Sequence, residues 1–377
     1  MKPAFVFGTR PEIIKLAPVI RAFEERSIEP LLIHTGQHYD YEMSKIFLEE
    51  LDLHRIDYHL EVGSGTQAYQ TGSAMIKIEE VLMKEKPDVT LVQGDTNTVL
   101  AGALASVKLK IPVAHVEAGL RSFDRTMPEE INRILADHAS EVLFAPTEEA
   151  KKNLEREGIS EGVYVVGNTI VDAVLQNSEI AERKSKILDK LGLRPKEYAV
   201  LTAHRAENTD SEENLKKLVE IIESLPITVI YPVHPRTEKR LKSLNLWSRL
   251  EKRAHVILTK PLGYLDFLKL QKNAKFVLTD SGGIQEESII LDVPCLTLRY
   301  NTERPETIKA GGNVLVGLEK ERVLYYVDRL LNDKQFYERM AKAPNPFGDG
   351  KSGERIVNTL LQLYEKGELR VKSSRFI

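Results

Sequence analysis

The sequence predicts an α/β protein with two doubly wound domains. Short apolar runs rich in β-branched residues alternate with longer stretches of helical spacing, and this alternation restarts in the second half of the chain. Strands that alternate with helices form βαβ units, in which helices cover both faces of a parallel sheet. A chain of 377 residues is also longer than one ordinary hydrophobic core requires, so we expect two domains.

The first half of the chain contains apolar runs with the length and composition of buried strands. They are AFVFG (4–8), PLLIHT (30–35), DVTLVQG (88–94), PVAHVE (112–117), VLFAP (142–146) and VYVVG (163–167). Segments such as 12–25 and 67–86, which lie between these runs, have helical spacing. This half therefore predicts a first Rossmann-like domain.

The second half repeats the pattern with a new set of strands. They are YAVLTA (198–203), TVIYPV (228–233), HVILT (255–259), KFVLTD (275–280), PCLTL (294–298) and NVLVG (313–317). Helical stretches again separate them, which predicts a second Rossmann-like domain.

We place the junction of the two domains near residues 167–172. The first domain is predicted to comprise 1–168 and a helix in 352–377 that returns to it, and the second to comprise 169–351. Ligands of open α/β sheets bind beyond the carboxyl ends of the strands. Two such edges that face each other would form a cleft, and we expect the active site there.

Composition excludes several classes of partner. The formal net charge of −3 argues against general nucleic-acid binding, which needs a concentrated basic face. No apolar run approaches the length of a membrane span, and the apolar stretch at the N-terminus is too short for a signal peptide. Cys295 is the only cysteine, so it is expected to be buried and inert in a reducing, cytoplasmic setting.

The first motif with chemical potential is GTRPE (8–12), directly after the first strand. Gly8 suits a tight turn, and Pro11 suits the first turn of a helix. Arg10 and Lys15 would place cations near the N-terminus of that helix, where backbone N–H groups also attract anions. A plain glycine turn with surface cations is an equally open interpretation.

The second motif is SGGIQEE (281–287), after the strand that ends at Asp280. Gly282 and Gly283 would let the backbone approach a pyrophosphate at the start of a helix. Glu287 could accept both hydroxyl groups of a ribose, and Asp280 is predicted to cap a helix. The alternative is an ordinary turn with a solvated glutamate.

Basic residues at other strand ends could complete an anion site. His204 and Arg205 end the strand AVLTA and can bind phosphate oxygens, although Arg205 fits a structural role equally well. His234 ends TVIYPV and is better interpreted as a packed loop histidine. Arg304, in TERPE (302–306), opens another predicted helix and could add a further cation.

Three carboxylates are candidates for acid–base chemistry. Asp95 follows the strand TLVQG, Glu117 follows PVAHV, and Glu129 lies in MPEEINR (127–133). Carboxylates that converge on one volume raise one another's pKa and can take separate acid and base roles. Each alone is more often a cap or an ion-pair partner, but together they predict an active site.

No metal or other cofactor is expected. His34 and His38 are four residues apart, but they span a strand end and a loop and so cannot lie on one helix face. The sequence contains no HExxH motif or equivalent ligand cluster.

Taken together, these motifs resemble the non-hydrolysing UDP-N-acetylglucosamine 2-epimerase family, which has a GT-B glycosyltransferase-like fold. The resemblance rests on the following segments: GTRPEIIK (8–15), QGDTNT (93–98), HVEAGLRS (115–122), MPEEINR (127–133), HRAEN (204–208), HPR (234–236), DSGGIQEE (280–287) and TERPE (302–306). They occur in order over most of the chain, so the resemblance is specific.

The resemblance implies roles for individual residues. Those that carry over as active-site residues are Arg10, Lys15, Asp95, Glu117, Glu129 and His204, of which Asp95, Glu117, Glu129 and His204 would be catalytic. Those that carry over as UDP contacts are Ser281, Gly282, Gly283, Glu287 and Arg304, with Phe267 and the backbone of Leu262 near the uracil. The first domain would hold the acids, and the second would bind UDP.

The implied reaction is the reversible epimerisation of UDP-N-acetylglucosamine to UDP-N-acetylmannosamine. UDP leaves by anti elimination with the proton on C2, which gives 2-acetamidoglucal, and then adds back while a proton returns to the other face. The residues do not indicate which carboxylate removes the proton. The resemblance further implies a homodimer that acts on a UDP-sugar in polysaccharide biosynthesis, with no nucleic-acid or membrane partner.

Three other functions remain open. A sister branch of the family epimerises UDP-2,3-diacetamido-glucuronate and shares Gln37-His38-Tyr39-Asp40, but it typically departs at GTRPE and TERPE, which are intact here. A glycosyltransferase of the same fold would need an acceptor groove and one base instead of three acids. A non-catalytic nucleotide-sugar sensor would have no use for the acids.

Overall fold

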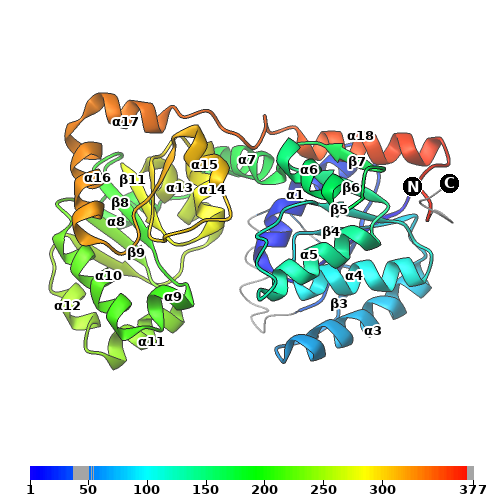
Figure 1. Ribbon diagram of the computed structural model, residues 1–377, viewed down its shortest axis with the longest axis horizontal. Coiled ribbons are helices and arrows are strands. Elements are labelled where there is room, and N and C mark those ends of the chain that lie inside the picture. Colours follow the sequence, from blue (N-terminus) through cyan, green and yellow to red (C-terminus); the bar gives the residue numbers. More distant parts are fainter. Residues whose placement is uncertain (37–50, 52, 54, 372–377) are drawn as a thin grey trace. The chain divides into compact units, whose positions relative to one another are not determined.

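The computed structural model describes residues 1–36, 51, 53 and 55–371 (Figure 1). The chain divides into two compact units: unit 1 comprises Met1–Ala173 and Phe347–Ile377, and unit 2 comprises Val174–Pro346. The sequence places these divisions at 168/169 and 351/352. In the structure the first division falls inside helix α7 (Thr169–Lys184).

Unit 1 is built on a parallel sheet, sheet A. In the described residues its strands are β1 (Pro3–Phe7), β2 (Leu31–His34), β3 (Tyr58–His59), β4 (Val89–Gln93), β5 (Val113–Val116), β6 (Val142–Ala145) and β7 (Val163–Val165). Their order across the sheet is β3-β2-β1-β4-β5-β6-β7, and all neighbours are parallel. Strands β2, β4, β5, β6 and β7 lie within the predicted runs, β1 begins one residue before its run, and β3 was not predicted.

The described helices that belong to unit 1 alone are α1 (Arg10–Glu24), α3 (Gln67–Glu85), α4 (Asn97–Lys108), α5 (Pro128–Ala139), α6 (Glu148–Arg156) and α18 (Ser352–Glu365). Helix α4 packs between α3 and α5, whereas α18 packs against α1 (Figure 1). The α1 helix begins with a capping box, in which the side chain of Thr9 and that of Glu12 each accept from the other's backbone N–H. This reciprocal cap fixes the start of α1 directly after β1.

Unit 2 is built on a second parallel sheet, sheet B. In the described residues its strands are β8 (Tyr198–Thr202), β9 (Thr228–Pro232), β10 (Val256–Thr259), β11 (Phe276–Thr279), β12 (Cys295–Thr297) and β13 (Asn313–Leu315). Their order is β10-β9-β8-β11-β12-β13, again with parallel neighbours. Each of these strands lies within a predicted run.

The helices of unit 2 are generally shorter than those of unit 1. They are α8 (Ile187–Leu191), α9 (Ala206–Thr209), α10 (Glu212–Ser224), α11 (Pro235–Ser243), α12 (Trp247–Glu251), α13 (Tyr264–Asn273), α14 (Gly282–Ile290), α15 (Pro305–Ala310), α16 (Lys320–Asn332) and α17 (Lys334–Ala341). The central strands are fully buried in both sheets, as in β1, β4 and β5 of sheet A and β8 and β11 of sheet B, and all neighbouring strands are parallel, which confirms the predicted class of two parallel-sheet α/β units.

Two further sequence-based expectations concern burial and membranes. Cys295 is fully buried, and this burial raises the pKa of its thiol to about 12. A thiol in that state is a structural side chain and not a nucleophile. Within the described residues, no helix combines the length and the apolarity that a membrane span requires.

Candidate active site

The carboxyl ends of β1, β4 and β5 lie next to one another because these strands are neighbours in a parallel sheet. Arg10 opens the helix that follows β1, Asp95 lies two residues after β4, and Glu117 directly follows β5. Three predicted site residues therefore come from adjacent turns at one edge of sheet A. Open α/β sheets bind their ligands at this edge.

Glu117 is a buried carboxylate in a strained backbone conformation. Its φ angle is +70°, and the residue is 7% exposed. Lys15 Nζ donates to Oε1 at 2.6 Å, Asn168 Nδ2 donates to the same oxygen at 3.3 Å, and Gln93 Nε2 donates to Oε2. Left-handed backbone costs a residue with a side chain about 1–2 kcal/mol, and such strain clusters at functional sites. The contact also brings together two of the predicted site residues.

Asp95 is held by a different partner. The guanidinium of Arg133, on α5, donates to Asp95 through Nη2 and to Glu130 through Nη1, the latter at 2.7 Å. Glu130 is buried and accepts from the backbone N–H groups of 122–123, so it anchors the loop before α5. The predicted Glu129 lies in the first turn of the same helix and is exposed. Neighbouring glutamates thus have different roles, since one supports the loop and the other faces solvent.

Glu12 organises the turn that precedes Arg10. Its carboxylate accepts from the backbone N–H of Gly8 at 2.7 Å and from that of Thr9 at 2.6 Å. Thr96, from the turn after β4, donates to its other oxygen. Burial raises the pKa of Glu12, although these donors oppose the shift. The motif analysis did not select Glu12, yet this side chain ties the turn of Arg10 to the turn of Asp95.

Gly8 is required by close packing. A Cβ at this position would lie 2.2 Å from Thr35 Oγ1 and 2.4 Å from Thr98 Oγ1, two hydroxyl groups that are hydrogen-bonded to each other at 2.8 Å. Its φ angle is not positive. The sequence predicts a tight turn at Gly8, and the structure adds that the residue must be small to make room for two threonines.

In unit 2, Asp280 gathers the residues that follow β8. Its carboxylate accepts from the backbone N–H groups of His204 and Arg205 at 3.0 Å each, and from Asn208 Nδ2 at 3.1 Å. It therefore anchors the start of α9 and not that of α14, which it precedes in sequence. The imidazole of His204 lies 6.2 Å from that of His234. Burial lowers the pKa of His234, and the neighbouring charge of His204 lowers it further.

The start of α14 is open around its glycines. A Cβ at Gly283 would meet no atom within 4 Å, and one at Gly282 would meet only Glu303 Oε2, at 3.8 Å. Ser281 is the N-cap, and its side chain makes no capping hydrogen bond. The protein itself would therefore tolerate larger residues here. Backbone N–H groups at such a helix start form an anion site.

Several charged side chains surround this helix start. Arg304 Nε lies 2.6 Å from Glu286 Oε1, and Glu286 is 1% exposed. Glu303 accepts from Arg299 at 2.7 Å and from Arg205 at 3.3 Å. Burial alone would raise the pKa of Glu303, but the two arginines lower it to about 2. The predicted cation Arg304 therefore already has a carboxylate partner from α14 in this structure.

The remaining predicted UDP contacts lie on α13, α14 and the segment before α13. Leu262 and Phe267 are half-buried and pack, together with Ile284 of α14, against one apolar cluster of unit 2. Glu287 is 9% exposed. The amide of Gln271, with its nitrogen oriented toward Glu287, donates to Oε2 at 2.9 Å. The side chain of Glu287 is thus held against α13.

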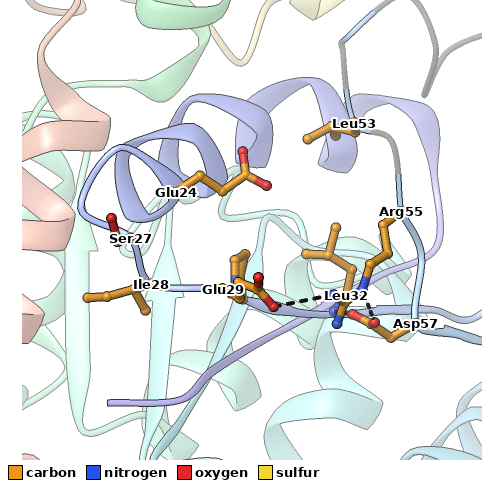
Figure 2. Close-up of a pocket in the computed structure, with 9 residues that line it drawn as sticks. Glu24, Ser27, Ile28, Glu29, Leu32, Leu53, Arg55 and Asp57 are labelled. Atoms are coloured by element: carbon orange, nitrogen blue, oxygen red, sulfur yellow. Dashed lines mark hydrogen bonds and ion pairs between the residues drawn. The ribbon is translucent and has the colours of Figure 1, made fainter.

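A cavity of about 480 Å³ in unit 1 is unrelated to these residues (Figure 2). Glu24 and Ser27, near the end of α1, line one side, and Leu32, Arg55 and Asp57 line another. Since α1 starts at the carboxyl end of β1, the end of the helix lies at the opposite edge of the sheet. None of the predicted site residues is part of the lining.

The histidine pair considered for metal binding is only partly described. His34 is buried against the rings of Phe7 and His59, and burial lowers its pKa to about 4. His38 and the rest of the segment 37–40 lie outside the described residues. Over 1–36, 51, 53 and 55–371, no three His, Cys, Asp or Glu side chains are grouped so that they could hold a metal ion.

Comparison with known proteins identifies the family. The family model described as UDP-N-acetylglucosamine 2-epimerase matches residues 21–361. The chain belongs to this family. It is similar to the UDP-N-acetylglucosamine 2-epimerase of Methanocaldococcus jannaschii, with 57% identity over 367 residues that cover 96% of this chain and 99% of that one. The family consists of isomerases, so this protein is an enzyme of that class.

A solved structure of that enzyme and one further relative bear on fold and substrate. A crystal structure of the Methanocaldococcus jannaschii enzyme in complex with UDP-GlcNAc and UDP matches with a TM-score of 0.86 and 56% identity, and the match covers 96% of this chain and 100% of that one. The UDP-2,3-diacetamido-2,3-dideoxy-D-glucuronate 2-epimerase of Pseudomonas aeruginosa is 40% identical over 375 residues, 96% of this chain and 100% of that one. The structural match gives the two sheets a GT-B-like fold.

Proposed function

We propose that this protein interconverts UDP-N-acetylglucosamine and UDP-N-acetylmannosamine by inverting C2. The observation that carries the proposal is the buried carboxylate of Glu117, in left-handed backbone at the carboxyl end of β5. It occurs in a chain that is 57% identical to a protein named UDP-N-acetylglucosamine 2-epimerase. A carboxylate held in this way is suited to proton transfer at a fixed carbon atom.

The proposed reaction breaks two bonds and forms them again. A base removes the C2 proton while the C1–O bond to UDP breaks, which gives 2-acetamidoglucal and UDP. UDP oxygen then adds back to C1, and an acid delivers a proton to the other face of C2. Asp95, Glu117 and Glu129 are the proposed acids and bases. Lys15 donates to Glu117 and so controls the direction in which that carboxylate faces.

We assign UDP binding to unit 2, at the start of α14. The open glycines Gly282 and Gly283 support this assignment, because among the described residues a Cβ at either position would meet no more than an ordinary contact with Glu303. A pyrophosphate would occupy that space, and its oxygens would accept from the first-turn N–H groups. The charge-bearing partners proposed for UDP are Arg10, Lys15, His204 and Arg304, with Ser281 and Glu287 as hydrogen-bonding partners and Leu262 and Phe267 near the uracil.

A single experiment tests the reaction. The purified enzyme is incubated with UDP-N-acetylglucosamine alone in deuterated buffer, and the sugar is followed by NMR. We expect a manno product with deuterium at C2, because the proton that returns comes from solvent. If the sugar changes only after an acceptor is added, the protein is a glycosyltransferase. If it binds UDP-N-acetylglucosamine and never exchanges C2, it is a sensor.

The same assay separates the two epimerase branches. The relative named for UDP-2,3-diacetamido-2,3-dideoxy-D-glucuronate is 40% identical, compared with 57% for the relative named for UDP-N-acetylglucosamine. We therefore expect the larger kcat/KM with UDP-N-acetylglucosamine when both sugars are supplied separately. A preference for the diacetamido-glucuronate would reassign the substrate.

We also propose that the enzyme is a homodimer that associates through α3. Tyr69, Ile76 and Met83 are 57%, 59% and 60% exposed, and they recur every seven residues. That spacing places them on one face of the helix, which suits packing against another helix.

The proposed UDP-sugar substrate of the enzyme and the single buried Cys295 fit a cytoplasmic role in polysaccharide biosynthesis.

Replacing all three residues by Gln is expected to convert the dimer into a monomer, because the apolar face would be lost. Sedimentation velocity measures the mass. The control is Tyr325→Gln, which removes a tyrosine on α16 that is 58% exposed and should leave the mass unchanged. A triple variant that remains a dimer would place the interface elsewhere.

A further inference from the structure

A buried group of charged side chains lies under the turns of Asp95 and Glu117. His115 of β5 and Asp137 of α5 are each 0% exposed, and His115 Nδ1 lies 2.6 Å from Asp137 Oδ1. Arg121 Nη1 lies 2.8 Å from the other oxygen of Asp137, and Arg121 also donates to both oxygens of Glu157 at 2.7 Å. The proposed mechanism does not use these residues.

Both ring nitrogens of His115 face acceptors. Nδ1 faces the carboxylate of Asp137, and Nε2 lies 2.8 Å from the carbonyl oxygen of Gly94. A neutral imidazole has only one N–H, so one of these contacts would place a lone pair against an oxygen. Both contacts are hydrogen bonds only when the ring carries two protons. The geometry therefore requires an imidazolium.

The surrounding charges support the same protonation state. Asp137 also accepts from the backbone N–H of Gly119 at 3.1 Å and faces Arg121, so its own oxygens are occupied by donors. With His115 protonated, two cations balance the carboxylates of Asp137 and Glu157. Burial alone would lower the pKa of His115 and Arg121 opposes its charge, but Asp137 and the Gly94 carbonyl raise the pKa above its ordinary value.

This group connects the two turns that carry the proposed acid–base residues. Gly94, which accepts from His115, directly precedes Asp95. Gly119, which donates to Asp137, follows Glu117 by two residues. Gly119 has a φ angle of +80°, and a Cβ at this position would lie 2.2 Å from the carbonyl oxygen of Ala150. No other residue therefore fits this turn. A substitution of His115 would therefore shift the turns that carry both carboxylates, because hydrogen bonds connect His115 and Asp137 to each turn.

We infer that His115, held as an imidazolium between Asp137 and the Gly94 carbonyl, is a positioning residue that sets the relative placement of Asp95 and Glu117. The inference rests on the proposed epimerisation. It predicts a large effect on the chemical step and a small one on UDP affinity, because most of the proposed UDP contacts belong to unit 2.

The test compares His115→Gln and His115→Asn with the wild-type enzyme, and uses His255→Gln as the matched control. His255 is a histidine of unit 2 whose Nε2 lies 3.2 Å from one backbone carbonyl. We expect kcat and the rate of C2 deuterium exchange to fall about 10²-fold in the His115 variants, the effect of a misplacement of about 1 Å. The Kd for UDP should stay within about twofold, which corresponds to about 0.4 kcal/mol in binding free energy.

Rates are expressed per UDP-binding site, counted by calorimetry, so that partial unfolding does not resemble slow catalysis. Full kcat per site in a His115 variant would overturn the inference. A fall in UDP affinity that equals the fall in kcat would also overturn it, because it would indicate a general structural role. If the wild type does not epimerise UDP-N-acetylglucosamine, the proposed function fails instead.

The protonation state can be measured in the wild-type enzyme, with variants used only to assign the signals. In wild-type enzyme with ¹⁵N-labelled histidine, both nitrogens of His115 should show bound protons at pH 8, where a free imidazole is neutral. His255→Gln spectra and His115→Gln spectra assign the signals. One protonated and one bare nitrogen at His115 would contradict the inference, even if the variants were too unstable to assay.

The raised pKa also gives the stability a predicted pH dependence. A group whose folded pKa exceeds its unfolded value of about 6.5 stabilises the fold fully below that value and loses this effect as pH rises through the folded pKa. The Tm difference between wild type and His115→Gln should therefore be largest near pH 6 and shrink at higher pH. A difference that grows with pH would contradict the imidazolium.

Discussion

Asp95→Asn and Glu117→Gln are expected to lower kcat by about 10²–10⁴-fold, the usual contribution of a general acid or base. Each substitution keeps the size of the side chain and removes its ability to take a proton. The Kd for UDP should change little, because neither carboxylate is a proposed contact of the nucleotide and most of those contacts belong to unit 2. Initial rates by NMR and UDP calorimetry measure the two quantities.

Glu117→Gln should also reduce stability, whereas Asp95→Asn should not do so to the same extent. Lys15 and Gln93 both donate to Glu117, so the amide nitrogen of a glutamine must face one of these donors. An unsatisfied buried group costs about 1–3 kcal/mol. Glu80→Gln, on an exposed position of α3, is the matched control. Near-normal turnover in both acid variants would remove these residues from the mechanism.

Gly283→Ala is expected to stabilise the protein and weaken UDP binding. The added Cβ meets no protein atom within 4 Å, and alanine is favoured over glycine in a helix by about 1 kcal/mol. The same methyl group would occupy the space proposed for the pyrophosphate. Loss of one charge-assisted hydrogen bond, about 1.5–3 kcal/mol, corresponds to roughly ten- to hundredfold in Kd.

Gly72→Ala provides the matched control for this experiment. Gly72 lies within α3, and a Cβ there also meets nothing within 4 Å. Its substitution should raise Tm in the same way and leave the Kd for UDP unchanged. Unchanged UDP affinity in Gly283→Ala, together with a raised Tm, would move the nucleotide away from the start of α14.

The fold could be predicted from the sequence because each buried strand is a short apolar run between helical stretches. The differences lie at the ends of elements. Several predicted runs extend one or two residues past the observed strands, because their last residues, such as Gly94 and Glu117, belong to the turns that follow. β3 was missed, since Tyr58 and His59 form a two-residue edge strand and carry no periodic signal.

The candidate site was predictable to the extent that strand ends reveal it. Asp95 and Glu117 follow apolar runs of sheet A, and His204 follows one of sheet B; parallel strands place such positions at the carboxyl edge of each sheet. The supporting residues were not predictable. Glu12, Glu130 and His115 have their roles because of partners distant in sequence or on other elements, and a single sequence does not show those pairings. The motifs GTRPE, HVEAG and PEEINR contained these three residues, but only the structure distinguishes Glu130 from Glu129.

The packing of α18 on α1 has a consequence for the order of folding during synthesis. Ile356, Val357 and Leu360 of α18 are fully buried, and the N–H of Gly353 donates to Asp172 at 2.8 Å. A Cβ at Gly353 would lie 2.9 Å from the carbonyl oxygen of Pro18. The apolar surface of α1 therefore depends on residues that the ribosome adds only after it has made all of unit 2.

Unit 2 is one continuous segment, whereas unit 1 is split. A nascent chain that has reached residue 346 already contains all of unit 2, but its unit 1 still lacks the helix that covers α1. We therefore expect unit 2 to complete its folding first, although it is made second, which reverses the usual order of N-terminal domain first. Until α18 emerges from the ribosome, α1 would present an uncovered apolar face to chaperones.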